Sequence, residues 1–218
     1  MTLPTRKFEF VLPTPTTILV AGPTGSGKTE LVSRMLEDSQ GFFANVIHEI
    51  RYHYGVWQER FALMRQEDPR YVFAPGVPTT TDLPDGSKHT VMVIDDLMKE
   101  VSESTTTADI FTKYSHHRNM TVIFIVQKLY SDSKTARVIS GNAQIIVLFK
   151  NPRDSRAISV LGSQMFPGRK GFLTSAFADA TKEPYSYLVV NAHQSTKEEL
   201  RVIGNLFDAE SPTVYTPR

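Results

Sequence analysis

The sequence has no cysteine, no long hydrophobic run and no marked excess of charge of either sign. The absence of cysteine excludes a disulfide framework and any metal site with cysteine ligands, and it is typical of proteins of a reducing compartment. The longest apolar runs, such as Val122 to Val126, have the length of a strand, whereas a helix that crosses a membrane needs about 20 apolar residues. No basic and then apolar leader precedes them, so we expect no membrane span.

The charges of the chain nearly cancel, with 24 Lys and Arg against 23 Asp and Glu. Segment 113–156 departs from this balance, because it carries a net charge of +6. Such a segment can contact phosphate groups, and we predict that its residues Lys128, Lys134 and Arg137 lie on a polar loop. Its two acids are Asp132 and Asp154, and its eight basic residues are Lys113, Arg118, Lys128, Lys134, Arg137, Lys150, Arg153 and Arg156.

Apolar, strand-like segments alternate with helix-like segments along most of the chain. This alternation predicts an α/β fold with a mainly parallel sheet and helices on both faces. We expect one domain over residues 16–207, an N-terminal arm over 1–15 and a C-terminal tail over 208–218. The expected strands are 16–21, 45–50, 71–73, 90–94, 121–126, 143–149 and 185–190, and the expected helices are 28–38, 56–67, 107–117, 152–165, 171–180 and 196–207. In helix 56–67, the apolar stripe Val56, Trp57 and Phe61 predicts core packing.

A glycine-rich motif follows the first expected strand and opens the first expected helix. The run from Gly22 to Thr29 fits G-x-x-x-x-G-K-[ST], the pattern of a phosphate-binding loop. The strand before it and the helix after it favour this interpretation over an inert glycine-rich turn. We therefore predict that Lys28 reaches the β- and γ-phosphates of a nucleotide and that the Thr29 hydroxyl is a ligand of Mg²⁺. The predicted nucleotide-binding residues are Gly22, Pro23, Thr24, Gly25, Ser26, Gly27, Lys28 and Thr29.

Two carboxylates follow the apolar strand 90–94. In a Walker B strand, the first acid, Asp95, would hold Mg²⁺ through water, and the second, Asp96, would polarise the attacking water. An acidic pair after a strand can also cap a helix, where it interacts favourably with the helix dipole. The presence of a phosphate-binding loop earlier in the chain favours the Walker B interpretation.

A polar residue, Gln127, ends the next expected strand, in which five apolar residues precede it. At the carboxyl edge of the sheet, where open α/β folds bind their ligands, its amide could contact the γ-phosphate or the attacking water. An ordinary polar strand end is the alternative.

Several strings of residues resemble the viral genome-packaging ATPases of the FtsK/HerA superfamily. They are the phosphate-binding loop, Ile94-Asp95-Asp96-Leu97-Met98, His116-His117-Arg118-Asn119-Met120-Thr121-Val122-Ile123-Phe124, the strand end at Gln127, and Leu148-Phe149-Lys150-Asn151-Pro152-Arg153-Asp154. The chain is most similar to the branch of Maverick/Polinton elements, adintovirus-like viruses and virophages, which is related to the poxvirus packaging ATPase. The resemblance extends over about residues 16–190.

The resemblance implies a RecA-like P-loop core that binds ATP and Mg²⁺, hydrolyses ATP and assembles into a homo-oligomeric ring, commonly of six subunits. Such a ring would pump double-stranded DNA, without sequence preference, into a preformed capsid, at a capsid vertex or through a capsid protein. The implied location is the host cytoplasm or nucleus at sites of viral assembly, or the virion vertex. The superfamily at large usually has Glu as the second acid, so Asp96 is a departure, and Glu100 is a substitute candidate one helical turn later.

A ring of this kind requires an arginine that one subunit donates to the nucleotide of its neighbour. Arg156 stands where related translocases carry a similar Asp-Ser-Arg string. Arg153 lies three residues earlier, and we expect it on the same helix, with Asn151 as cap and Pro152 as first residue. Arg118 and Arg137 are rivals, and a solvated helix arginine is the alternative for each.

Three other functions remain open. One is a FtsK/HerA-type translocase with another DNA-processing role, such as end processing or plasmid transfer. A second is a small-molecule P-loop kinase, which Asp96 and the lack of an arginine-rich lid disfavour. The third is a P-loop protein that does not hydrolyse nucleotide and serves as a nucleotide-gated component of capsid assembly.

Overall fold

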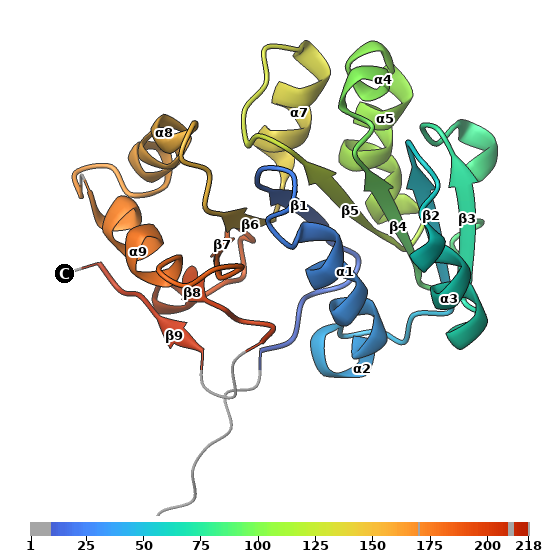
Figure 1. The fold of residues 1–218 in the computed structure, drawn as a ribbon, viewed down its shortest axis with the longest axis horizontal. Coiled ribbons are helices and arrows are strands. Elements are labelled where there is room, and N and C mark those ends of the chain that lie inside the picture. Colours follow the sequence, from blue (N-terminus) through green and yellow to red (C-terminus); the bar gives the residue numbers. More distant parts are fainter. Residues whose placement is uncertain (1–9, 170, 209–211, 218) are drawn as a thin grey trace, which may run out of the picture.

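A computed structural model describes residues 10–169, 171–208 and 212–217, which form one nine-stranded sheet with helices against it (Figure 1). The strand order is β3-β2-β4-β5-β1-β6-β7-β8-β9. The strands are β1 (Thr17–Ala21), β2 (Glu49–Tyr54), β3 (Tyr71–Pro75), β4 (Thr90–Asp95), β5 (Met120–Val126), β6 (Ile145–Phe149), β7 (Tyr187–Asn191), β8 (Val202–Gly204) and β9 (Thr213–Val214). Within the described ranges, no helix is long and apolar enough to cross a membrane.

The six neighbouring strands from β3 to β6 are parallel, and β7, β8 and β9 continue the sheet in antiparallel pairs. Every residue of β1, β4, β5 and β6 is buried. Strands of a parallel sheet are covered on both faces, which explains why their sequences are apolar runs without polar alternation. The predicted α/β fold with a mainly parallel sheet is therefore confirmed.

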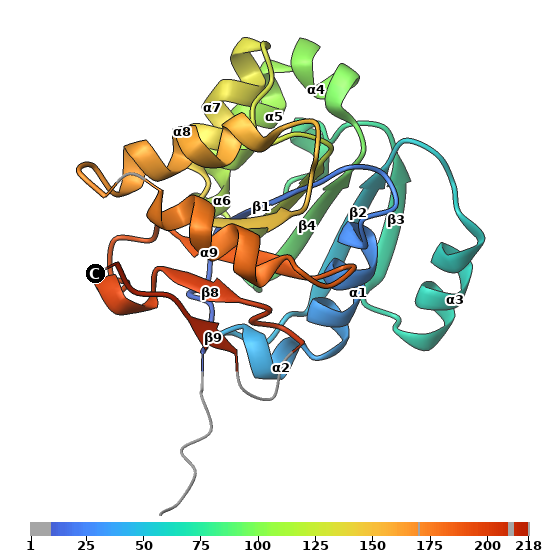
Figure 2. The ribbon, with the colours of Figure 1, turned by 60° about the vertical axis from the view of Figure 1, so that its left-hand side comes forward.

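The two faces of the sheet have separate cores, which alternate residues of each strand enter. In β1, Ile18 and Val20 point to one core, and Leu19 and Ala21 point to the other. The first core contains side chains of α1 (Lys28–Glu37), α2 (Ser39–Phe42) and α3 (Glu59–Glu67). The second contains side chains of α4 (Met98–Glu103), the π-helix η2 (Ile110–Tyr114), α7 (Lys134–Asn142), α8 (Ser155–Met165) and α9 (Phe172–Ala180). Figure 2 shows α8 beside α9, and α9 next to β8.

Short elements complete the chain. They are the 3-10 helices η1 (Thr80–Asp82) and η3 (Glu198–Leu200) and the α-helices α5 (Thr105–Asp109) and α6 (Ser115–His117). Because α5, η2 and α6 follow one another without a break, they together occupy the whole of the expected helix 107–117.

The largest error of the sequence-based prediction concerns residues 196–207, which do not form a helix. Only η3 is helical there, and Val202, Ile203 and Gly204 form β8 instead. The helical spacing of apolar residues is misleading, because Ile203 pairs with Val189 of β7 and is fully buried in the sheet. Three α-helices were not predicted, namely α2, α4 and α7, and α7 places Lys134 and Arg137 on a helix rather than on a loop.

Strand β2 and helix α3 both begin later than the sequence indicates. Expected over 45–50, β2 occupies Glu49–Tyr54, because Ile50 and Tyr52 are the side chains that enter the core. Helix α3 begins at Glu59, and the preceding Val56 and Trp57 are 79% and 47% exposed. Core packing of these two residues was therefore a wrong prediction, although the indole ring contacts the rings of three neighbours, Tyr54, Phe61 and Phe73.

The described parts of the expected arm and tail contact the body of the domain. Leu12 is fully buried, and its backbone pairs with that of Phe42 and Ala44. At the other end, β9 joins the sheet beside β8, and the Tyr215 hydroxyl donates to Asp179 over 2.8 Å. The rest of both segments, residues 1–9, 209–211 and 218, lies outside the described residues.

Candidate functional site

The glycine-rich loop joins the carboxyl end of β1 to the first turn of α1. Gly27 has φ 96°, a left-handed conformation that side chains other than glycine adopt only with strain. Gly22 passes so close to β6 that an added Cβ atom would lie 2.6 Å from Cβ of Phe149. The loop therefore requires glycine at both positions, and it leads into the N-terminus of α1, where free backbone N–H groups carry the positive end of the helix dipole and favour an anion.

The Lys28 side chain lies back across this loop. Its Nζ donates a hydrogen bond to the carbonyl oxygen of Pro23 over 2.9 Å. Burial lowers the pKa of the Lys28 ammonium, while the nearby carboxylates Asp95 and Asp96 act in the opposite direction. The lysine is thus a partly desolvated cation placed between the loop and the two acids.

Asp95 ends β4 and accepts two hydrogen bonds from side chains of other elements. The hydroxyls of Thr29 and Tyr52 donate to its Oδ2 atom over 3.2 Å and 2.6 Å. Burial raises the pKa of the Asp95 carboxyl, and the two hydrogen bonds counteract this rise. Burial and the adjacent carboxylate also raise the pKa of Tyr52 well above its usual value, so this phenol is a donor.

The pair of Thr29 and Asp95 fits a magnesium site. Mg²⁺ prefers hard oxygen ligands, and proteins usually hold it with one or two side chains while water and phosphate oxygens complete its shell. A hydroxyl and a carboxylate that contact each other beside the glycine-rich loop could supply those side chains. Thr29 comes from the first turn of α1 and Asp95 from the end of β4, so the site depends on the packing of two elements.

The second acid, Asp96, faces solvent at the carboxyl edge of the sheet. Gln127, which follows β5, donates its side-chain amide to Oδ1 of Asp96 over 2.9 Å. Asp96 has φ 54°, a left-handed conformation that Asp and Asn adopt more readily than most residues and that is enriched at functional sites. Gln127 thus contacts the second acid directly, and the predicted contact with phosphate or water remains a prediction.

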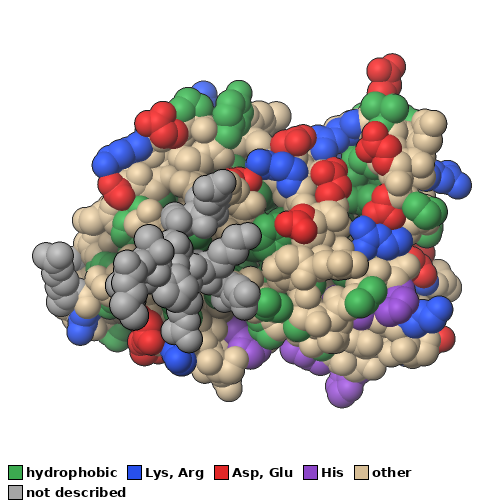
Figure 3. Space-filling model, turned by 90° about the horizontal axis from the view of Figure 1, so that it is seen from below, with side chains coloured by type: hydrophobic (Ala, Val, Ile, Leu, Met, Phe, Trp, Pro, Cys, Tyr) green, Lys and Arg blue, Asp and Glu red, His purple; other side chains and the backbone are tan. Residues whose placement is uncertain are grey.

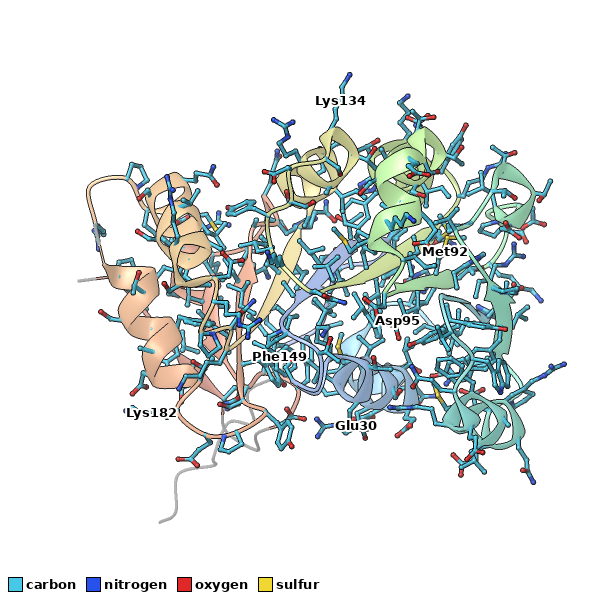
Figure 4. The ribbon with its side chains drawn as sticks, turned by 45° about the horizontal axis from the view of Figure 1, so that its top comes forward. Glu30, Met92, Asp95, Lys134, Phe149 and Lys182 are labelled. Carbon is cyan, nitrogen blue, oxygen red and sulfur yellow. The ribbon has the colours of Figure 1, made fainter. Side chains whose placement is uncertain are left out.

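These side chains surround one cavity of about 720 Å³, which we call the main cavity. In Figure 4, Asp95 lies on one side of the loop that leads into α1 and Phe149 on the other. The main cavity is lined by Thr24, Gly25, Gly27, Lys28, Thr29, Glu30, Arg34, Gln58, Arg60, Asp95, Asp96, Gln127 and Tyr185. Of the other predicted loop residues, Pro23 and Ser26 line a neighbouring cavity and Gly22 packs against β6.

Two arginines of the main cavity were not predicted as site residues. Arg60 of α3 donates to Oγ of Ser33 over 2.8 Å and pairs with Glu30 at 3.3 Å, so it lies against α1. Arg34 of α1 pairs with Asp208 at 2.7 Å. Arg34 could have been suspected, because it lies two helical turns after the loop, whereas no local signal brings Arg60 to α1.

The arginines proposed as fingers do not line the main cavity of their own chain. Arg156 is an exposed residue in the first turn of α8. This helix begins at Ser155 with Asp154 as its N-cap, so the predicted start at Pro152 with Asn151 as cap was wrong. Asn151 instead caps the preceding turn by accepting from the backbone N–H of Arg153. The remaining rivals lie elsewhere, Arg118 after α6 and Arg137 on α7.

The basic segment 113–156 includes α7, on the opposite side of the molecule from the face shown in Figure 3. Lys134 points away from the body of the protein (Figure 4), and Arg137 donates to the backbone oxygen of Asp132. On the face of Figure 3, basic and acidic side chains are interspersed. Lys134 and Arg137 of α7 thus lie away from this mixed face.

Replacing Tyr52 by Phe is expected to weaken both the fold and the candidate metal site. The substitution leaves the buried Asp95 carboxylate with one hydrogen bond fewer, which costs about 1 to 3 kcal/mol of the free energy of unfolding. We also expect weaker nucleotide binding in Mg²⁺, with little change in EDTA, as measured by titration. Tyr71→Phe is the matched control, because the described residues offer that buried hydroxyl no hydrogen-bond partner. Equal effects of the two substitutions would contradict the prediction.

Comparisons with known proteins support the fold of the chain. No protein-family model matches the sequence, and no curated protein matches it. Among solved structures, the DNA-packaging ATPase of Sulfolobus turreted icosahedral virus is similar with a TM-score of 0.51 at 13% identity, over 95% of this chain and 100% of that one. A KaiC-like protein of the hyperthermophilic archaeon Pyrococcus horikoshii has a TM-score of 0.45 at 11% identity, over 93% and 90% of the two chains. The chain thus has an α/β fold similar to that of a viral DNA-packaging ATPase.

Proposed function

We propose that the protein is an ATP-hydrolysing motor that moves double-stranded DNA into a viral capsid. The observation that carries the proposal is the convergence of a phosphate-binding loop, the Thr29–Asp95 pair and the Asp96–Gln127 pair on the main cavity. A cavity with these groups can hold a nucleoside triphosphate and direct water at its last phosphate. The fold similarity to a viral DNA-packaging ATPase supports the same function.

Each residue of the main cavity has a distinct role in the proposed reaction. The loop from Gly22 to Thr29 would bind the phosphates, and Lys28 would neutralise charge that develops as the γ-phosphate leaves. Thr29 and Asp95 would hold Mg²⁺, which supplies electrostatic stabilisation of the phosphate oxygens when bound. Asp96 would polarise the attacking water. The side-chain amide of Gln127 would fix the orientation of the Asp96 carboxylate.

The partners of the motor follow from charge and from the proposed ring. The whole chain is close to neutral, and its positive charge is concentrated in segment 113–156. A homo-oligomeric ring would repeat this basic segment around a central DNA duplex and so raise the local positive charge. The basic residues offer contacts to phosphate groups, and we expect DNA binding without sequence preference. In this proposal the protein forms a hexamer that binds a capsid vertex or a capsid protein at sites of viral assembly.

DNA-stimulated ATP hydrolysis and translocation test the proposal. We expect duplex DNA to stimulate hydrolysis in Mg²⁺, ATP to drive displacement of a triplex-forming strand from a duplex, and DNA affinity to fall steeply from roughly 50 to 200 mM salt. Lys134→Ala combined with Arg137→Ala should weaken DNA stimulation, whereas Arg65→Ala on α3 is the matched control. Nucleotide binding without hydrolysis would favour a capsid-assembly component. Hydrolysis without translocation would contradict a motor.

A further inference from the structure

Tyr185 is an exposed aromatic residue in a strained conformation beside the phosphate-binding loop. Tyr185 lies two residues before β7, is 71% exposed and has a φ of 65°. A bulky residue with a positive φ is uncommon, because its Cβ crowds the backbone, and such strain concentrates at functional sites. Neither exposure of the ring nor this backbone conformation is explained by packing of the core.

The Tyr185 ring covers the last glycine of the loop. A Cβ atom added to Gly27 would lie 3.5 Å from Cδ1 of Tyr185 and 3.7 Å from Cε1 of Phe149. Tyr185 also lines two cavities at once, the main cavity and a neighbouring one of about 330 Å³, which we call the side cavity. The side cavity is lined by Pro23, Thr24, Gly25, Ser26, Phe149, Lys150, Lys182, Glu183, Pro184, Tyr185 and Ser186.

The strand order decides which end of a nucleotide would meet this ring. Asp95 is the last residue of β4, and β4 and β5 lie on one side of β1, whereas β6 and β7 lie on the other. If the last phosphate is held near Asp95 and Asp96, the phosphate chain runs along the loop past Lys28 and its nucleoside end leaves on the side of β6 and β7. The side cavity and Tyr185 lie on that side.

We propose that Tyr185 is a stacking platform for the base of the bound nucleoside triphosphate and that the side cavity is the subsite for its nucleoside. The inference rests on the proposed function and deepens it. The ring offers an exposed π-face at the shared border of the two cavities, and buried Phe149 supports the loop below it. The left-handed backbone at Tyr185 holds the ring over Gly27 and outside the core, while Tyr187 of β7 is fully buried.

The test compares ligands with and without a base on the wild type and on two variants of Tyr185. Tyr185→Asn removes the ring but tolerates a positive φ, and Tyr185→Phe keeps the ring. We expect the Asn variant to bind Mg·ATP about 5- to 100-fold more weakly, as for loss of one stacking contact, and inorganic tripolyphosphate with unchanged affinity. Phe should bind both ligands within about twofold of the wild type, because it keeps the aromatic ring on which the base would stack.

The outcomes separate this inference from the proposed function. Unchanged ATP affinity of Tyr185→Asn, or equal losses of ATP and tripolyphosphate, would overturn the stacking role, and retained tripolyphosphate binding shows that the variant is folded. Lys28→Ala should weaken the binding of both ligands, because the lysine would contact the phosphates that ATP and tripolyphosphate share. A wild-type protein that binds neither ligand would instead contradict the proposed nucleotide site itself.

Discussion

Asp96→Asn is expected to lower the rate of ATP hydrolysis by roughly 10²- to 10⁴-fold and to leave ATP affinity nearly unchanged. The substitution removes the charge that would polarise the attacking water, whereas Asp95, Thr29 and Lys28 remain to bind Mg²⁺ and phosphate. Asparagine keeps an oxygen that can accept the hydrogen bond from Gln127, and it tolerates the φ of 54° at this position. The loss therefore concerns the chemical step rather than the shape of the site.

Single-turnover hydrolysis and ATP titration measure the two quantities separately. Glu100→Gln is the matched control, because Glu100 is an exposed acid in the first turn of α4 that does not line the main cavity. We expect this control to hydrolyse ATP at the wild-type rate. If Asp96→Asn loses Mg²⁺-dependent ATP binding as well as turnover, Asp96 is a metal ligand and the group that activates water lies elsewhere.

Arg156→Ala is expected to lower ATP hydrolysis by roughly 10³- to 10⁵-fold in the assembled protein, as for removal of an arginine finger. Arg156 is exposed at the start of α8 and does not line the main cavity of its own chain. It can therefore serve a nucleotide only across a subunit boundary. Because an arginine of this kind stabilises charge that develops in the transition state, ATP affinity should change little.

Mixing of inactive subunits distinguishes action across a boundary from action within one chain. Arg156→Ala and Asp96→Asn subunits, each inactive alone, should together regain hydrolysis, since some interfaces then pair an intact Asp96 with an intact Arg156. Lys28→Ala mixed with Asp96→Asn should regain none, because Lys28 and Asp96 line the main cavity of the same chain. Failure of the first mixture, in particles shown to contain both subunits, would contradict the role of Arg156 and leave Arg153, Arg137 and Arg118 for the same experiment.

The fold class and the loop could be predicted because their signals lie within short segments. Buried parallel strands such as β1 and β5 are uninterrupted apolar runs, and the loop from Gly22 to Thr29 needs glycine for reasons that its own backbone conformation explains. The prediction failed for segments with a weak pattern. Strand β8 contains only three residues, and its apolar pair Val202 and Ile203 fits a helix as well as a strand.

By itself, the sequence determined the glycine-rich loop between a strand and a helix, the two acids after an apolar strand and the mainly parallel α/β fold. Only the tertiary structure decided that Tyr52 donates to Asp95, that Arg60 lies against α1 and that Tyr185 covers Gly27. The physical reason is that these contacts join residues of different elements, and their geometry depends on the strand order and on the packing of α1 and α3 on one face of the sheet. A local pattern specifies an element, but the order in which buried strands pair specifies which side chains meet at its edge.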